Sequence, residues 1–285
     1  MTTILSIQSS VAYGHAGNSA ATFPLMRLGV EVWPVLTVHF SNHTGYGSWR
    51  GPLFPATDVA EVVTGIDERG VLGRCDAILS GYQGAEDVGQ VVLDAAALVK
   101  RRNPTATYCC DPVLGDVDRG FFVRPGIPEF MRDQVVPTAD LITPNLFELE
   151  FLTGVAVRST ADLLAAADKA REMGPDLVLV TSALHEETAA GELDMIVVSG
   201  RGAWIVSTPR LDFGMLSGCG DMTSATFLAH WLESHDEAVA LSRTASIVYG
   251  VLKITSDAQA EELRLVTAQD EFVTPSHTFT ARRLR

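Results

Sequence analysis

Lysine is the scarcest charged residue in this chain: of 285 residues, only Lys100, Lys169 and Lys253 are lysines. Each falls in a stretch with helical patterning, away from any glycine-rich turn. The formal net charge is −14, whereas a nucleic-acid surface needs clustered lysine and arginine. A nucleic-acid partner is therefore not expected. A phosphate ligand would have to be held by backbone amides, arginine or a metal ion.

Cysteines and long apolar runs are also few. The four cysteines, Cys75, Cys109, Cys110 and Cys219, show no CxxC spacing, so neither a zinc site nor a disulfide framework is indicated. Apolar runs stay well below the roughly 20 residues that cross a bilayer, and the N-terminus lacks a basic region followed by a long apolar segment. We expect a cytoplasmic protein with reduced thiols and no membrane partner.

What the chain does contain is enough apolar sequence for a large core, since 47% of its residues are hydrophobic. Amphipathic stretches, such as Asp87 to Arg101, Thr160 to Met173 and Met222 to Ser234, alternate with short apolar runs rich in β-branched residues. Those runs are TILSI, VEVWPVL, CDAILS, ATYCCD, ADLIT, DLVLVTS, IVV and WIV. The alternation predicts one α/β domain over residues 1–285, with a mostly parallel central sheet flanked by helices on both faces.

One connection is unusual in composition. The segment from Phe40 to Pro55 contains SNHTGYGSWRGP, which is too rich in glycine, serine, asparagine and aromatic residues for a core element. It is also long for a strand-to-helix connection. We interpret it as a functional flap.

The turn SGCGD, Ser217 to Asp221, places two glycines directly before an aspartate and leads into a helical pattern. Gly218 and Gly220 allow a tight turn with exposed amides, and a helix N-terminus adds a partial positive charge, so the turn suits an anion. Asp221 then has two readings that the segment alone leaves open. It either caps the helix or acts as a base beside a phosphoryl group.

Several motifs carry a family resemblance. SGCGD resembles the GxGD signature of the ribokinase superfamily, and TPNLFELE, with Asn145 and Glu148, resembles its NxxE motif. IQSSVAYGHAGNSAA, FSNHTGYG, LSGYQG and CDPVLGD resemble pyridoxal kinases, in the right order and over essentially the whole chain. The resemblance implies a ribokinase-like fold with a flap over the active site, and a homodimer.

The resemblance also implies an activity: transfer of the ATP γ-phosphoryl group to the 5'-hydroxyl of pyridoxal, pyridoxine or pyridoxamine, in salvage of pyridoxal 5'-phosphate. Asp221 matches the catalytic base, within the anion-binding turn of Gly218, Cys219 and Gly220. The positions that match the vitamer side are Ser10, His43, Thr44, Gly45, Tyr82 and Asp221. A pyridine ring needs an aromatic wall, which Tyr82 or Tyr46 can supply. His43 can equally be an ordinary solvated loop residue.

The nucleotide and metal positions follow from the same resemblance. The residues that match ATP-contacting positions are Asp111, Thr143, Glu148, Thr181, Ser182, Thr208, Pro209, Arg210 and Leu211. Glu148 with Asn145 resembles the element that organises Mg2+ through water, as suits a cation that keeps its hydration shell. Asp111 and Asp116 are candidates for a monovalent cation such as K+ or for polarising the metal shell. Some relatives carry lysine at the position of Thr181, so charge neutralisation here must come from elsewhere.

Two competing functions stay open at this stage. A hydroxymethylpyrimidine kinase shares the GxGD base and the sheet, although the long flap favours the pyridoxal reading. A non-catalytic pyridoxal phosphate-binding protein is the second alternative, but none of the three lysines lies near a site loop for a Schiff base. The chain has no GxxxxGK[ST] motif and no GxGxxG after its first strand, so neither a P-loop kinase nor a Rossmann dehydrogenase is indicated.

Overall fold

The computed structural model describes residues 1–212, 214 and 216–285. The strands are β1 (Thr3–Val11), β2 (Glu31–Phe40), β3 (Ala77–Ser80), β4 (Thr107–Cys110), β5 (Gly115–Asp116), β6 (Gly120–Phe121), β7 (Leu141–Ile142), β8 (Leu177–Ala183), β9 (Glu192–Ser199), β10 (Gly202–Pro209) and β11 (Arg282–Arg283). The helices are α1 (Asn18–Arg27), α2 (Ala56–Glu68), α3 (Glu86–Arg102), α4 (Ile127–Phe130), α5 (Leu146–Thr153), α6 (Thr160–Glu172), α7 (Cys219–Ser234) and α8 (Glu237–Asp257). Each apolar run singled out in the sequence lies in one of these strands.

The described residues form a nine-stranded sheet in the order β11-β10-β9-β8-β7-β4-β3-β1-β2. Six neighbouring strands of this sheet, β8, β7, β4, β3, β1 and β2, pair in parallel. This confirms the mostly parallel sheet. The remaining strands, β9, β10 and β11, are antiparallel to their neighbours. Only two residues, Gly200 and Arg201, join β9 to β10, and so short a connection permits only an antiparallel hairpin.

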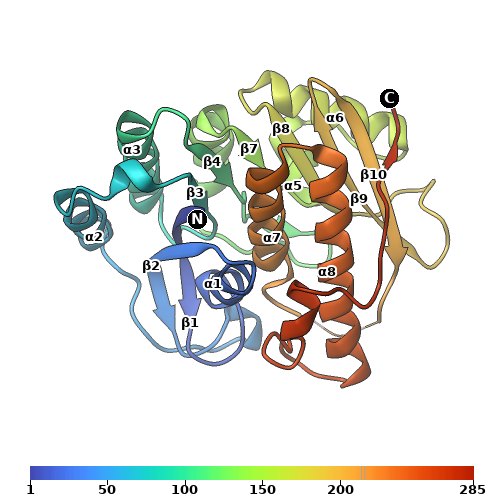
Figure 1. Ribbon diagram of the computed structural model, residues 1–285, viewed down its shortest axis with the longest axis horizontal. Coiled ribbons are helices and arrows are strands. Elements are labelled where there is room, and N and C mark those ends of the chain that lie inside the picture. Colours follow the sequence, from blue (N-terminus) through green and yellow to red (C-terminus); the bar gives the residue numbers. More distant parts are fainter. Residues whose placement is uncertain (213, 215) are drawn as a thin grey trace.

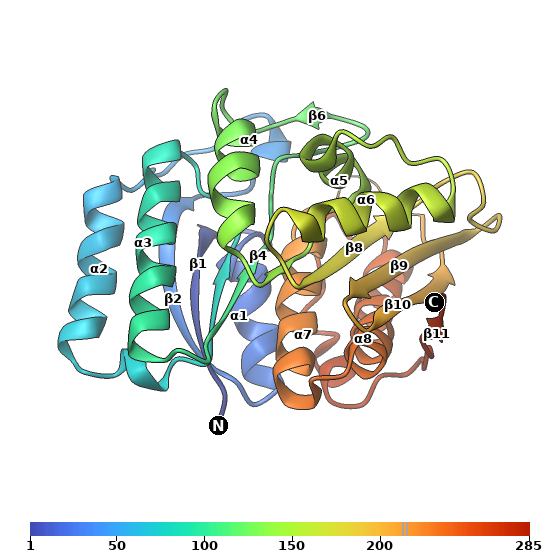
Figure 2. The ribbon, with the colours of Figure 1, turned by 90° about the horizontal axis from the view of Figure 1, so that it is seen from above.

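Helices cover both faces of the sheet, as Figures 1 and 2 show. Successive strand residues point to opposite faces, so Ile78 packs in the cluster with α2, α3, α5 and α6, while its neighbours Ala77 and Leu79 pack with α1, α7 and α8. Both clusters are continuous across the sheet, which explains why the parallel strands read as unbroken apolar runs.

The carboxyl ends of the parallel strands collect the loops that carry the sequence motifs. The predicted flap is the connection from β2 to α2, and it runs back along β2, where the His39 N–H donates to the Pro52 carbonyl and the Ser41 N–H to the Arg50 carbonyl. A small hairpin of β5 and β6, which the sequence did not predict, follows β4. Within the described part of the chain, no helix has the length and apolar character needed to cross a membrane.

Candidate active site

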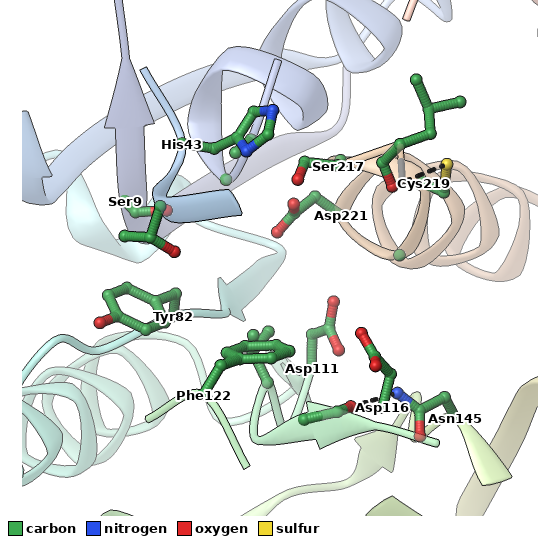
Figure 3. A pocket seen from close by; sticks show the side chains of 18 of the residues that line it. Ser9, His43, Tyr82, Asp111, Asp116, Phe122, Asn145, Ser217, Cys219 and Asp221 are labelled. Carbon is green, nitrogen blue, oxygen red and sulfur yellow. Dashed lines mark hydrogen bonds between the residues drawn. The ribbon is translucent and has the colours of Figure 1, made fainter. Parts of the chain in front are cut away.

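A cavity of about 240 Å³ lies where these loops meet the start of α7. Figure 3 shows its side chains converging from several elements. On one side, Ser9 of β1, His43 and Thr44 of the flap, and Tyr82 after β3 line it. On the other side lie residues after β4 and β7 and near the end of β8: Asp111, Asp116, Thr143, Asn145, Glu148, Thr181 and Ser182. Most of the candidates named from the sequence therefore lie around one cavity.

The first turn of α7 forms the floor of this cavity. Its N-cap is Gly218, with φ of 86° and no side-chain capping bond. A Cβ at this position would lie 2.3 Å from the His15 carbonyl oxygen, so both the backbone angle and the space require glycine. The first N–H groups of a helix have no partner within the helix, and here they face the cavity at Cys219 and Gly220. This is the geometry of an anion-binding turn.

Asp221 is the third residue of α7 and not its N-cap. The capping interpretation of this aspartate is therefore wrong, and the carboxylate is left for the cavity, where Figure 3 shows it between His43 and Asp111. Burial raises the pKa of Asp221, and a hydrogen bond from the Gly17 N–H lowers it by less than burial raises it. Burial also raises the pKa of the Cys219 thiol to about 12, so Cys219 contributes its backbone and not a thiolate nucleophile.

Asp111 faces Asp221 across the cavity, at the end of β4, and is only 4% exposed. Its Oδ2 accepts a hydrogen bond from Ser224 Oγ at 3.0 Å, and Ser224 Oγ is 2.7 Å from Thr143 Oγ1. Burial raises the pKa of Asp111 well above its usual value, and the negative charges of Asp221 and Glu148 raise it further. The site therefore concentrates negative charge that a bound cation would neutralise.

Asn145 and Glu148 form a capping box at the start of α5. The Glu148 N–H donates to Asn145 Oδ1, and Glu148 Oε2 accepts from the Asn145 N–H, both at 2.9 Å. Glu148 Oε1 also accepts from the Leu114 N–H at 2.9 Å, which ties the loop after β4 to the helix. Burial raises the pKa of Glu148 to about 7 despite these bonds. The NxxE motif thus has a structural role in addition to any role toward metal.

The cavity side chains that could hold a metal ion are oxygen donors, at Asp111, Asn145 and Glu148, and oxygen ligands are those that Mg2+ takes. The described residues contain no group of three or more histidine, cysteine, aspartate or glutamate side chains spaced to hold a metal ion. Asp116 is engaged by Arg119, whose Nε donates to Oδ2 at 2.7 Å. Burial acts to raise the pKa of Asp116, but the hydrogen bonds from Arg119 outweigh it and lower the pKa. Carboxylates that reach a cation through its water shell are typical of Mg2+.

A second cavity of about 560 Å³ adjoins the first. Thr208, Pro209, Arg210 and Leu211 line it, together with Tyr249 and Leu252 of α8. The residues that border both cavities are Asp116, Arg119, Thr181, Ser182, Leu216, Cys219 and Gly220. Ser182 has φ of 50°, an angle uncommon for serine that often marks a functional position. The two cavities therefore meet at the anion-binding turn of α7.

At one position predicted for the vitamer side, the neighbouring residue lines the cavity instead. Ser9 lines the cavity, whereas the Oγ of Ser10 lies 3.0 Å from Ser19 Oγ, away from it. Adjacent strand residues point to opposite sides, so only one of the two serines can face the cavity. Gly45 also lies outside this cavity and borders a separate hollow beneath the flap. Arg119 also lines the cavity, although no sequence motif marks it. It lies in the hairpin between β5 and β6, which the sequence did not predict.

The chain is similar to known proteins along its length. A family model described as phosphomethylpyrimidine kinase matches residues 74–264. A pyridoxal kinase PdxY of Rubrobacter xylanophilus is 56% identical over 282 residues, covering 99% of this chain and 97% of the relative. One from Leifsonia xyli subsp. xyli is 53% identical and covers 99% of both.

Solved structures are similar over the same length. The pyridoxal kinase from Leishmania donovani in complex with ADP and pyridoxine matches 99% of each chain, with a TM-score of 0.91 and 26% identity. The same enzyme in complex with ADP and pyridoxamine gives a TM-score of 0.91 at 27% identity over 99% of each chain.

Proposed function

The chain belongs to the pyridoxal kinase family, and from this premise we infer that it phosphorylates B6 vitamers with ATP. The observation that carries the mechanism is the position of Asp221, which lines the first cavity directly after Cys219 and Gly220, the two residues of its turn that border both cavities. On its vitamer side lie Ser9, His43, Thr44 and Tyr82. A hydroxyl that enters from this side reaches the carboxylate and the anion-binding turn together.

We propose that Asp221 is the general base. Its carboxylate takes the proton of the vitamer 5'-hydroxyl while the hydroxyl oxygen forms a bond to the γ-phosphorus of ATP. The bond from the γ-phosphorus to the oxygen that bridges it to the β-phosphorus breaks, and ADP leaves with that oxygen. The raised pKa of Asp221 supports this role, because a carboxylate with a higher pKa accepts a proton more readily.

The first turn of α7 would hold the transferring phosphoryl group. The N–H groups of Cys219 and Gly220, with the positive end of the helix, stabilise the charge that develops on its oxygens. Mg2+, held through water by Asn145, Glu148 and Asp111, would supply the remaining positive charge that neutralises the phosphate chain. Burial raises the pKa of Glu148 to about 7, and a cation nearby would lower it again and keep this carboxylate ionised.

Arg119 is our candidate for the charge that lysine supplies in some relatives. Among the described residues it is the only arginine or lysine that borders both cavities. Its guanidinium is held by Asp116 at 2.5 Å and lies over the Phe122 ring. A planar guanidinium fits phosphate oxygens in pairs, so a small shift from Asp116 would place it on the phosphate chain.

The nucleotide base and sugar would occupy the second cavity, between Thr208 to Leu211 and α8. Tyr249 and Leu252 give this cavity an aromatic and an aliphatic wall, as sites for flat apolar rings commonly have. A homodimer and K+ as a candidate monovalent cation remain predictions from the resemblance, and a single domain over residues 1–285 remains a prediction from the sequence pattern.

The two alternatives are disfavoured by specific observations. Lys100 bonds Asp140 and Lys253 bonds Asp257 on the outer surface, and no lysine borders either cavity among the described residues, which argues against a Schiff-base carrier. The matched family model covers pyrimidine kinases, but the relatives that match along the full chain are pyridoxal kinases.

A coupled assay tests the proposal directly. The protein is given MgATP with pyridoxal, pyridoxine, pyridoxamine or hydroxymethylpyrimidine, and kcat/KM is measured for each. We expect the B6 vitamers to be preferred. A preference for the pyrimidine would reassign the enzyme to the alternative kinase, and ATP-independent binding without turnover would support the carrier.

A further inference from the structure

The carboxylate of Glu262 ties together two loops that border the vitamer half of the cavity. Glu262 lies in the segment after α8, and its side chain is 13% exposed. Oε1 accepts a hydrogen bond from Tyr46 Oη of the flap at 2.8 Å. Oε2 accepts from the backbone N–H of His15, in the loop between β1 and α1, at 3.1 Å. A single side chain therefore joins segments separated by more than 200 residues.

Glu262 also faces the one histidine of the flap. Nε2 of His43 lies 3.1 Å from Glu262 Oε1, and the His43 ring packs against Tyr46 with 4.5 Å between the ring centres. His43 is 8% exposed and lines the cavity. In the described part of the chain, neither ring nitrogen makes a hydrogen bond of good geometry. A buried imidazole without such a bond is held by its neighbours and is available to a ligand.

The loop opposite makes room for this carboxylate. Gly14 has φ of 80°, and a Cβ there would lie 2.2 Å from Glu262 Oε2. A carboxylate withdrawn from water is costly unless it is hydrogen-bonded, and here the two loops provide both donors. The hydrogen bond to Glu262 raises the pKa of Tyr46 above its usual value, so the tyrosine stays a donor.

We propose that Glu262 is a positioning residue that fixes His43 and the flap over the vitamer. It acts through Tyr46 and His15, and it does not touch the reacting atoms. Without it, the flap would keep its backbone hydrogen bonds to β2 and to the loop between β1 and α1, but lose its side-chain link to the segment after α8. The inference rests on the proposed function, since it takes the Ser9 and His43 side of the cavity to be the vitamer side.

Kinetics of three variants test the proposal. Glu262→Ala removes both hydrogen bonds and the charge, and we expect the KM for pyridoxal to rise about tenfold to a hundredfold, in keeping with the loss of bonds to a charged group. Glu262→Gln keeps an acceptor for Tyr46 and should give a smaller rise. The KM for MgATP should change less than about twofold, because Glu262 does not line the cavity proposed for the nucleotide. Glu261→Gln, at the exposed neighbour, is the matched control and should resemble the wild type.

A second measurement does not depend on activity. Arg50 in the flap is exposed, so trypsin can cut before Gly51 when the flap opens. We expect cleavage at Arg50 to accelerate in Glu262→Ala and in Tyr46→Phe, relative to cleavage at exposed Arg69. Faster cleavage with an unchanged KM for pyridoxal, or unchanged cleavage in both variants, would overturn the proposal. A wild-type protein that protects Arg50 through Glu262 but phosphorylates no vitamer would instead refute the proposed function.

Discussion

The pair of carboxylates formed by Asp111 and Asp221 determines how the site responds to pH. Both have raised pKa values, mainly because burial disfavours the charged form, and the charge of Asp221 contributes to the shift of Asp111. A base works only when deprotonated, so activity is present above the raised pKa and is lost as the pH falls through it. The acidic limb of the rate profile should therefore lie above the usual aspartate value of about 3.9.

Asp111→Asn tests this coupling. The charge of Asp221 raises the pKa of Asp111, so Asp221 ionises while Asp111 is still neutral. Asparagine resembles this neutral form, so we expect the acidic limb to stay in place, whatever happens to the maximal rate. The measurement is kcat against pH from about 4 to 9 for both proteins. A limb that moves to lower pH in Asp111→Asn would mean that the charge of Asp111 controls the ionisation of Asp221.

Arg119 gives a second prediction at this scale. Because it borders both cavities, Arg119→Ala should lower kcat about 10²-fold by removing a donor to the transferring group. Arg119→Lys should fall between, since it keeps the charge but not the paired geometry. Arg210→Ala, which borders only the nucleotide cavity, is the control and should mainly raise the KM for ATP. Equal effects of both alanine variants on kcat would contradict the assignment.

Individual site residues could be predicted from the sequence only where they belong to a recognisable motif. The anion-binding turn could be placed because its glycines and the following helix are adjacent in sequence. Ser10 was chosen where Ser9 faces the cavity, because a one-residue difference in a strand exchanges its two faces. Glu262 gave no signal, since its partners Tyr46 and His15 are 216 and 247 residues away.

Among the elements, the start of α7 has the strictest requirements. Gly218→Ala would force alanine into φ of 86° and a Cβ against the His15 carbonyl. We expect a loss of about 1–3 kcal/mol in the free energy of unfolding, together with a loss of turnover as the anion-binding turn shifts. Gly29→Ala is a matched control, because Gly29 has φ of 78° but open space around its Cα.

Urea unfolding and kcat are measured for both alanine variants. Gly29→Ala should cost about 1 kcal/mol and leave turnover unchanged. If Gly218→Ala loses no more stability and keeps its turnover, the geometry of the turn does not control catalysis.

The elements themselves were largely predictable. The strands and the helices α3, α6 and α7 followed from apolar periodicity, because burial on one stripe or on both faces leaves a direct pattern in the sequence. The β5–β6 hairpin was not predicted, since its two-residue strands are too short for any periodicity. The antiparallel edge was missed because strand direction depends on connection length rather than on composition.

On the scale of the whole molecule, the proposed function assigns the two substrates to different parts of the chain. Ser9, His43 and Thr44, from the first strand and the flap, line the cavity proposed for the vitamer, and Thr208 to Leu211 with α8 line the cavity proposed for the nucleotide. The matched family segment, residues 74–264, contains the nucleotide side and Asp221 but not the first three. The preference for a vitamer over a pyrimidine is therefore expected to lie mainly in the N-terminal part.

The central claim is that these two halves deliver their ligands to Asp221. The most direct measurement compares the wild type with Asp221→Asn, in turnover of pyridoxal and in affinity for MgATP. Asparagine keeps the size of the side chain but cannot take the hydroxyl proton, so we predict a fall in kcat of about 10²- to 10⁴-fold with nucleotide affinity nearly unchanged. A variant that turns over pyridoxal at the wild-type rate would contradict the account.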